Sequence, residues 1–175
     1  LVGEQFDGHD YVADVLAKGV AAVIVSREVV AGDARQIVVA DTLAALGQIA
    51  QAWRLKWNPK IVALTGSNGK TTVKEMCAAI LRTALGEGAV LATAGNFNNE
   101  IGMPLTLLRL QAAHKVAVLE MGMNHFGELV RLTQIAKPDV ALVNNASRAH
   151  IGNDFNGVAD IARAKSEIYA GLNSE

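Results

Sequence analysis

Short apolar runs alternate with segments of helical periodicity along most of the chain, which predicts strands that alternate with helices. After Asn58-Pro59 the alternation is regular, and three of its apolar runs contain no polar positions. Such runs are typical of parallel strands that are covered on both faces and joined by crossover helices. We expect strands at Ile61–Thr65, Val90–Ala94, Val116–Glu120 and Val140–Asn144, and helices at Lys70–Leu85, Pro104–Leu110, His125–Ile135 and Val158–Leu172.

The residues before Asn58 form a smaller block with the same alternation. They predict a short helix at Tyr11–Lys18, strands at Val20–Val25 and Gln36–Ala40, and a helix from about Leu43 to Trp57. Because Asn58-Pro59 interrupts the pattern, we expect two parts, residues 1–57 and 58–175. The expected fold class is α/β: a small α/β part, then a P-loop-type, mostly parallel sheet with flanking helices.

Composition excludes several classes of protein. The chain of 175 residues carries 16 basic and 17 acidic side chains, a net charge of −1, which lacks the basic footprint of a nucleic-acid-binding protein. Its 51% hydrophobic residues are sufficient for a packed core, but no apolar run approaches the ~18 residues that span a bilayer. The single cysteine, Cys77, favours a reducing compartment. We therefore expect a cytoplasmic monomer with no nucleic-acid partner and no membrane insertion.

A glycine-rich segment follows the first strand of the second part and opens the next helix, whose expected apolar stripe is Val73, Met76, Cys77, Ile80, Leu81 and Ala84. Glycines allow backbone N–H groups to turn toward an anion, and the amino end of a helix adds a positive dipole. Lys70 can reach terminal phosphates, and the Thr71 hydroxyl can hold Mg²⁺. Leu64 stands where the longer form of this loop has glycine, and an ordinary strand-to-helix turn is the alternative. The expected phosphate-binding residues are Gly66, Ser67, Asn68, Gly69, Lys70, Thr71 and Thr72.

Two further side chains are expected at the carboxyl edge of the sheet, where ligands gather in parallel α/β folds. Glu120 ends an apolar strand, so its carboxylate is a candidate Mg²⁺ ligand. The alternative is that Glu120 caps or pairs with the turn at Gly122 and Asn124. His150 follows the strand that ends at Asn144, and it is either a ligand at that edge or an ordinary surface histidine.

Lys165 lies within the apolar stripe of the last predicted helix. A lysine on an inner face must extend its ammonium to solvent, pair with a carboxylate, or have a lowered pKa. A partly neutral amine can also react with CO₂ to form a carbamate, an anionic oxygen donor suited to Mg²⁺. From the residues alone, extension to solvent or pairing with Glu167 or Asp160 is favoured.

The segment Gly95–Pro104, between a predicted strand and a predicted helix, contains the asparagines Asn96, Asn98 and Asn99. Amides both donate and accept hydrogen bonds, so this cluster suits a sugar, a diphosphate or metal-bound water. A turn whose asparagines cap their own loop explains the pattern equally well.

Five segments that occur together and in order resemble the Mur ligase family of peptidoglycan synthesis: residues 65–72, 95–104, 119–128, 143–150 and 162–168. The resemblance spans essentially the whole chain, and the family's phosphate loop has the shorter Gly-x-x-Gly-Lys-Thr form found here. It implies an ATP-dependent amide-bond ligase of three domains that forms an acyl phosphate. Residues 1–57 then resemble the latter part of the N-terminal UDP-substrate-binding domain, and residues 58–175 the front part of the central ATP-binding domain.

The resemblance also implies the roles of individual residues. Lys70 would contact the γ-phosphate of ATP, while Thr71 and Glu120 would bind a first Mg²⁺ and His150 a second. Lys165 matches the family's carbamylated lysine, which makes Lys70, His150 and Lys165 the expected catalytic residues. Asn96, Asn98 and Asn99 match a loop near the substrate and the metals.

Residues 3–10 and 95–104 favour, within this family, UDP-N-acetylmuramoyl-tripeptide and D-alanyl-D-alanine as the substrates. Sister Mur ligases and folylpolyglutamate synthetases share the loop and the lysine, and they are the alternatives among enzymes. A nucleotide-binding module without ligase activity is an alternative of another class. Because the sequence opens at Leu1 and the rest of the family's domains are absent, we expect a piece of a longer enzyme that is inactive alone.

Overall fold

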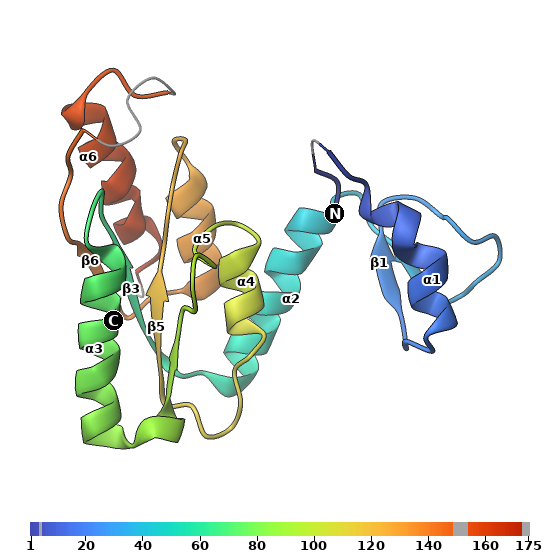
Figure 1. Ribbon diagram of the computed structural model, residues 1–175, viewed down its shortest axis with the longest axis horizontal. Helices are drawn as coiled ribbons and strands as arrows, with labels where there is room; N and C mark the ends of the chain where they lie inside the picture. Colours follow the sequence, from blue (N-terminus) through green and yellow to red (C-terminus); the bar gives the residue numbers. More distant parts are fainter. Residues whose placement is uncertain (4, 149–153, 173–175) are drawn as a thin grey trace. The chain divides into compact units, whose positions relative to one another are not determined.

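The computed structural model describes residues 1–3, 5–148 and 154–172 (Figure 1). The chain divides into two compact units, Leu1–Leu46 and Gly47–Glu175. In the part of the chain that the structure describes, no helix combines the length and the apolar character needed to cross a membrane.

The first unit is a small α/β arrangement. A 3-10 turn, η1 (Gly8–Tyr11), leads into α1 (Val12–Ala17), and β1 (Val23–Val25) pairs in parallel with β2 (Gln36–Val38). Its core consists of Val12, Leu16 and Val25, which form one buried cluster. The Asp7 carboxylate caps η1 by accepting the His9 N–H, and it also contacts the His9 ring, which is buried.

The second unit is built on a four-stranded parallel sheet with the order β4-β5-β3-β6 (Figure 1). The fold class predicted from the sequence is therefore confirmed. The strands are β3 (Lys60–Thr65), β4 (Val90–Ala92), β5 (Val116–Glu120) and β6 (Val140–Val143). The helices are α2 (Thr42–Trp57), which begins in the first unit, α3 (Lys70–Leu85), α4 (Gly102–Leu107), α5 (Glu128–Ala136) and α6 (Val158–Ser166), with the 3-10 turns η2 (Glu87–Ala89) and η3 (Glu167–Gly171).

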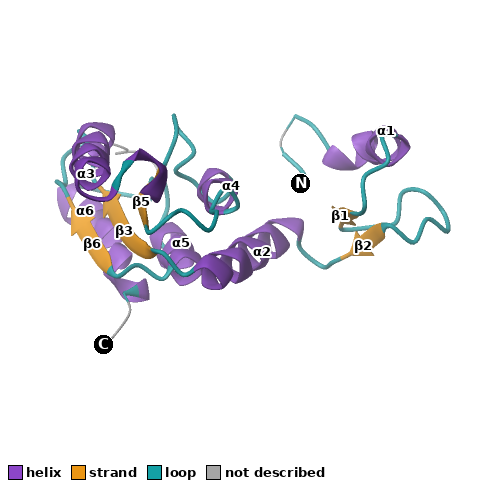
Figure 2. Cartoon of the chain, turned by 90° about the horizontal axis from the view of Figure 1, so that it is seen from below, coloured by secondary structure: helices purple, strands orange, loops and turns teal. Residues whose placement is uncertain are grey.

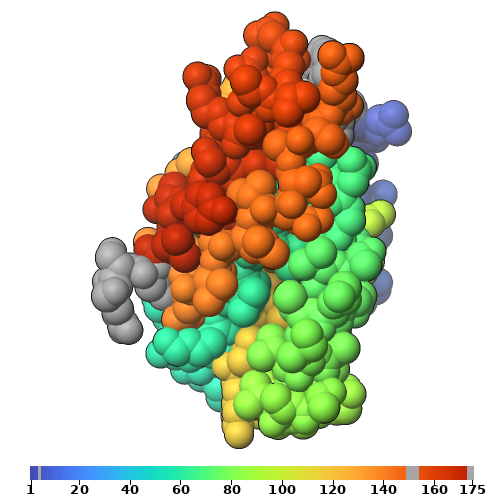
Figure 3. All heavy atoms as spheres, turned by 90° about the vertical axis from the view of Figure 1, so that its left-hand side faces the viewer, coloured from blue at the N-terminus to red at the C-terminus, as the bar shows by residue number. Residues whose placement is uncertain are grey.

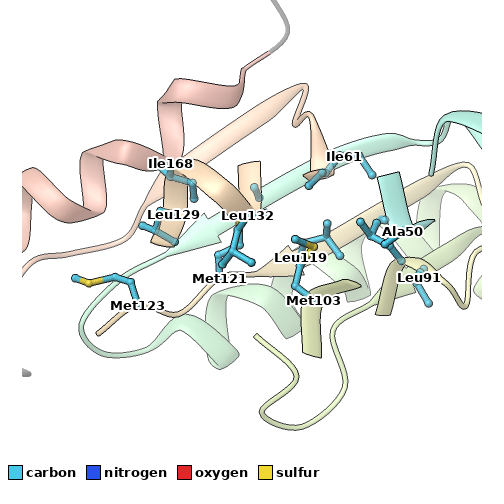
Figure 4. Packing of buried hydrophobic residues seen from close by; sticks show 14 of the residues in the cluster. Ala50, Ile61, Leu91, Met103, Leu119, Met121, Met123, Leu129, Leu132 and Ile168 are labelled. Carbon is cyan, nitrogen blue, oxygen red and sulfur yellow. The ribbon is translucent and has the colours of Figure 1, made fainter. Parts of the chain in front are cut away.

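Helices cover both faces of this sheet, as its uninterrupted apolar strands predict. On one face, Leu64 and Val118 form a buried cluster with Ala78 of α3. On the other face, a larger cluster joins the sheet to α2, α4, α5 and η3 (Figure 2). Figure 4 shows part of this second cluster and labels, among others, Ala50, Ile61, Met103, Leu119, Leu129, Leu132 and Ile168.

The later part of α2 belongs to the second unit and packs against the rest of it. The Trp53 Nε1–H donates to the Leu110 carbonyl at 3.0 Å, and the buried Arg54 guanidinium donates to the Ala136 carbonyl at 2.9 Å. These contacts explain why the compact unit begins within α2 instead of after Asn58, where the sequence predicted the boundary. The assignment of the two parts to domains of a longer enzyme stays a prediction.

Several predicted elements differ from the observed ones in their end residues or in the face that is buried. The strand predicted at Val20–Val25 is limited to β1, and the last predicted helix continues from α6 as the 3-10 turn η3. On α3 the predicted apolar stripe is partly wrong, because Met76 is 60% exposed and Ile80 is 67% exposed. The fully buried positions of α3 are Lys74 and Ala78.

Candidate functional site

The loop between β3 and α3 lies where the sequence predicts an anion site. Gly69 stands at the N-cap of α3 with φ +72°, a left-handed conformation that glycine adopts without strain, and no side chain caps the helix. The first N–H groups of α3 therefore have no capping side chain and can bind an anion. Gly66 is closely packed, since a Cβ there would lie 3.1 Å from the Asn144 Cβ, which is tighter than an ordinary contact.

The segment that follows β6 holds this loop in place. The Ser67 and Asn68 N–H groups both donate to the Asn145 Oδ1 at 3.1 Å, and the Asn144 side chain donates to the Asn68 carbonyl. The Asn68 amide in turn donates to the Ser147 hydroxyl at 2.8 Å. In Figure 3 the orange residues after β6 lie directly beside the green residues of the loop and α3. The predicted role of Ser67 and Asn68 in phosphate binding stays a prediction, and both residues also fasten the loop.

Lys70 begins α3 and turns back over the loop. Its ammonium donates to the Gly66 carbonyl at 2.8 Å, which holds the positive charge beside the open amino end of the helix. Thr71 follows Lys70, and its hydroxyl donates to the Glu120 Oε2 at 2.9 Å. Thr72, the last residue of the predicted loop, is exposed.

Glu120 is the residue that connects the loop to the sheet. The register of β3 and β5 pairs Glu120 with Leu64, and the carboxylate is buried with only 2% of the residue exposed. Besides the Thr71 hydroxyl, it accepts the Asn98 side-chain amide at 2.8 Å. The alternative of a cap on the following turn is wrong, because the Asn124 N–H donates to Glu128.

The three asparagines of the predicted polar loop have different positions. Asn98 contacts the Glu120 carboxylate through its side chain, and its carbonyl accepts the Gly122 N–H at 2.8 Å. Asn99 caps the start of α4 by accepting the Gly102 N–H at 2.8 Å. Asn96 contributes its carbonyl to a turn with the Asn98 N–H. Of the three, Asn98 is the one that contacts the acidic residue.

Lys165 lies on the inner side of α6 with 2% of its surface exposed. Neither alternative weighed from the sequence applies: the side chain does not extend into solvent, and the two carboxylates have other partners. Glu167 accepts the Gly127 N–H, and Asp160 accepts the Asn156 N–H. Burial, and after it the positive charge of Lys70, lowers the pKa of Lys165 to about 8. The amine is therefore partly neutral near physiological pH.

The oxygen donors at this edge fit a magnesium ion. Thr71 and Glu120 offer a hydroxyl and a carboxylate 2.9 Å apart beside the amino end of α3, and Mg²⁺ prefers such oxygen ligands. Among residues 1–3, 5–148 and 154–172, no three His, Cys, Asp or Glu side chains gather as a metal site. Phosphate oxygens or water would have to complete the coordination. His150, the other predicted ligand, lies outside the described residues.

Two residues behind Glu120, Thr93 and Lys74, are not among those predicted from the sequence. Thr93 directly follows β4, and its hydroxyl accepts the Glu120 N–H at 3.0 Å. Lys74 of α3 donates to the Thr93 carbonyl at 2.7 Å. The signal that could have found Lys74 is its spacing of three from Thr71, which puts both side chains on one face of the helix.

Comparison with known families and curated proteins gives consistent results. The Mur ligase middle domain matches residues 64–175. The UDP-N-acetylmuramoyl-tripeptide–D-alanyl-D-alanine ligase of Haemophilus influenzae is 49% identical over 173 residues, and the Escherichia coli enzyme of that name is 46% identical over 172. These alignments cover 98% of this chain but only 38% and 37% of the relatives. The chain thus spans less than two fifths of the length of the curated relatives it matches.

Solved structures agree with this result. MurF from Acinetobacter baumannii has a TM-score of 0.91 at 45% sequence identity, and the match covers 99% of this chain and 37% of that one. MurF ligase from Thermotoga maritima, solved in complex with ADP, has a TM-score of 0.90 at 34% identity, with coverage of 99% and 39%. The family inferred from the sequence motifs is therefore confirmed.

Proposed function

Because the chain belongs to the Mur ligase family, we propose that it supplies the ATP-phosphate and magnesium site of a peptide ligase. Its relatives are named for joining D-alanyl-D-alanine to UDP-N-acetylmuramoyl-tripeptide, and we propose the same reaction for the enzyme that contains this chain. The observation that carries the proposal is the buried Glu120 carboxylate, which lies 2.9 Å from the Thr71 hydroxyl at the end of a phosphate loop.

The proposed role of residues Gly66 to Thr72 is to hold the phosphates of ATP. The N–H groups at the start of α3 would bind phosphate oxygens, and the Lys70 ammonium would neutralise the γ-phosphate. Thr71 and Glu120 would hold the first Mg²⁺, and that ion would supply positive charge against the phosphate oxygens. Two anions, a triphosphate and a substrate carboxylate, must meet at this site, so neutralisation and alignment are the main catalytic requirements.

We propose that Lys165 carries a carbamate and that His150 and this carbamate hold the second Mg²⁺. The neutral amine of Lys165 would attack the carbon of CO₂, form an N–C bond and lose a proton, which leaves an anionic oxygen donor. Burial and the lowered pKa of Lys165 support this step, because only the unprotonated amine reacts. The nearby Lys70 cation would then face an anion instead of a second cation.

In the proposed reaction, an oxygen of the tripeptide's terminal carboxylate attacks the γ-phosphorus, and ADP leaves. The amine of D-alanyl-D-alanine then attacks the acyl phosphate carbon, and inorganic phosphate leaves as the amide bond forms. No side chain of this chain is required to attack either substrate in this reaction. Lys70 and the amino end of α3 orient the phosphates, while Asn98 holds the Glu120 carboxylate in position.

The remaining assignments are part of the same proposal. Residues 1–57 would belong to the domain that binds the UDP-sugar substrate, and residues 58–175 to the ATP-binding domain. Asn96, Asn98 and Asn99 would lie near the substrate, with Asn98 acting through Glu120. We propose a cytoplasmic monomer, and we expect that this chain alone does not complete the ligation.

The proposal is tested by titrating ADP into the chain with and without Mg²⁺ in a calorimeter. ADP is expected to bind more tightly with Mg²⁺, and Glu120→Gln is expected to remove that difference. Glu87→Gln, at a highly exposed carboxylate, is the matched control. Lys70→Ala is expected to weaken ADP binding in both conditions. An affinity for ADP that is the same with and without Mg²⁺, and that Glu120→Gln does not change, would contradict the proposed site.

The substrate assignment needs the longer enzyme that contains this chain. Phosphate release from ATP should require both UDP-N-acetylmuramoyl-tripeptide and D-alanyl-D-alanine, and other amino donors should give little turnover. Turnover that prefers a single amino acid or a folate substrate would assign the chain to a sister ligase.

A further inference from the structure

Lys74 is the most unusual buried residue of the second unit. Only 1% of its surface is exposed, although burial of an ammonium costs several kcal/mol unless it is well paired. It lies in the second turn of α3, close to the helix end where the dipole disfavours positive charge. Lys70, four residues earlier on the same helix face, adds repulsion of like charges. A residue in this position must make contacts that offset these costs.

The contacts of Lys74 connect α3 to the end of β4. Its ammonium donates to the Thr93 carbonyl at 2.7 Å and pairs with the Glu75 carboxylate at 2.6 Å. Glu75 is more than half exposed, so this pairing is screened by solvent. The Thr93 carbonyl is the buried partner, since Thr93 is almost completely enclosed.

The hydrogen bonding between β4 and β5 changes at the residue that Lys74 contacts. The Thr93 N–H donates to the Val118 carbonyl at 3.0 Å, as expected in a parallel ladder. In a continued ladder the Glu120 N–H would donate to the Thr93 carbonyl. That carbonyl instead accepts Lys74, and the Glu120 N–H donates to the Thr93 hydroxyl at 3.0 Å. The regular pairing of the two strands accordingly ends at Ala92 and Val118.

We propose that Lys74 is a positioning residue for Glu120, the acidic metal ligand. Its ammonium donates to the Thr93 carbonyl, so the Thr93 hydroxyl becomes the acceptor for the Glu120 N–H and fixes the backbone there. The inference rests on the proposed function, in which Glu120 holds Mg²⁺. Helix α3 then controls Glu120 twice, through the Thr71 hydroxyl at the carboxylate and through Lys74 and Thr93 at the backbone.

The test measures how much Mg²⁺ strengthens ADP binding by the full 175-residue chain, expressed as the ratio of the Kd without Mg²⁺ to the Kd with it. Lys74→Met retains the length of the side chain and removes the donor, so the Thr93 carbonyl can accept the Glu120 N–H again. Loss of a residue that orients a metal ligand typically costs 10–100-fold in metal affinity, so the ratio should fall about tenfold. Simple removal of a positive charge would instead leave the ratio unchanged or raise it.

A second set of variants keeps the Lys74 charge. Thr93→Val removes the hydroxyl and should lower the ratio, whereas Thr93→Ser retains the hydroxyl and should keep the wild-type ratio. Thr133→Val is the matched control, because Thr133 is fully buried and its hydroxyl bonds within α5. Tryptophan fluorescence shows which variants fold. If Lys74→Met does not fold, the comparison of Thr93→Val with Thr93→Ser decides the outcome.

The outcomes separate this inference from the proposed function. A wild-type chain without any Mg²⁺ effect overturns both. A wild-type Mg²⁺ effect that survives in folded Lys74→Met or in Thr93→Val overturns only the role of Lys74. Loss of the effect in both of these variants, with retention in Thr93→Ser and Thr133→Val, is the result that we expect.

Discussion

Replacement of Lys165 by methionine should stabilise the second unit at neutral pH. The ammonium is buried and has Lys70 nearby, and its pKa is lowered from 10.5 to about 8. At about 1.4 kcal/mol for each pKa unit, this shift corresponds to about 3 kcal/mol of destabilisation by the charged form. Lys165→Met removes the charge and keeps an apolar side chain of similar length, so the free energy of unfolding should rise by about that amount.

The gain from Lys165→Met should depend on pH in a definite direction. Because the pKa of Lys165 is lower in the folded state, the unfolded state binds more protons between pH 8 and 10.5, and wild-type stability rises with pH there. The penalty is fully present below about pH 8 and disappears toward pH 10.5. The advantage of the variant should therefore shrink from about 3 kcal/mol at pH 7 to about 1 kcal/mol at pH 9.5.

Urea titration followed by tryptophan fluorescence measures this gain, since the chain's two tryptophans, Trp53 and Trp57, both belong to the second unit. Lys115→Met, at an exposed lysine, is the matched control and should change stability by less than about 0.5 kcal/mol. Buffers are freed of CO₂, and bicarbonate is then added to test the carbamate: it should stabilise only the wild type. An advantage of Lys165→Met that is absent at pH 7, or equal at pH 7 and 9.5, would refute the reasoning.

Two further predictions concern other parts of the chain. A Cβ on Gly102 would lie 2.4 Å from the Phe97 Cα, so Gly102→Ala should destabilise the second unit by about 1–3 kcal/mol in urea titration. Gly88→Ala, where a Cβ meets open space, should not, and equal effects would contradict the packing argument. In the first unit, the His9 N–H and then the Arg27 guanidinium lower the pKa of Asp7 from 3.8. The ionised carboxylate therefore stabilises the unit above about pH 4. Amide NMR signals of this unit should lose dispersion as the pH falls below 4, and in Asp7→Asn they should lack that dependence.

The sequence predicts two elements near the glycine-rich loop most accurately. The helix expected at Lys70–Leu85 and the strand expected at Val116–Glu120 are observed with those bounds. Both have local causes. Gly69 and Gly86 adopt positive φ at the two ends of the helix, and the strand is apolar at every position before its final glutamate.

The buried face of α3 could not be predicted in the same way. Helical periodicity predicts that the face with the most apolar residues is buried. That face includes Met76 and Ile80, but both side chains are exposed. Lys74 can be buried because its ammonium donates a hydrogen bond to the carbonyl of Thr93, which directly follows β4. Such a partner depends on the strand order β4-β5-β3-β6, which periodicity does not specify.

The asparagine loop and Glu120 show the same limit. The amide cluster predicted a polar site without indicating which asparagine contacts which group. The contact between Asn98 and Glu120 forms because the loop after β4 crosses the end of β5, where the Gly122 N–H also donates to the Asn98 carbonyl. Residue types therefore predict a polar site at this edge, while the pairing of its residues depends on the tertiary arrangement.

The bonds between Asn145 and the loop that joins β3 to α3 would compete with the proposed binding of an anion. An incoming anion that uses the Asn68 N–H must displace the Asn145 side-chain oxygen, and one that uses the Ser67 N–H must also displace the Asn145 backbone carbonyl. Exchange of one acceptor for another adds less to affinity than capture of an unbonded donor would. An arriving anion would therefore remove part of the bonding between the loop and the segment after β6, while the bond from the Asn145 side-chain N–H to the Asn68 carbonyl remains.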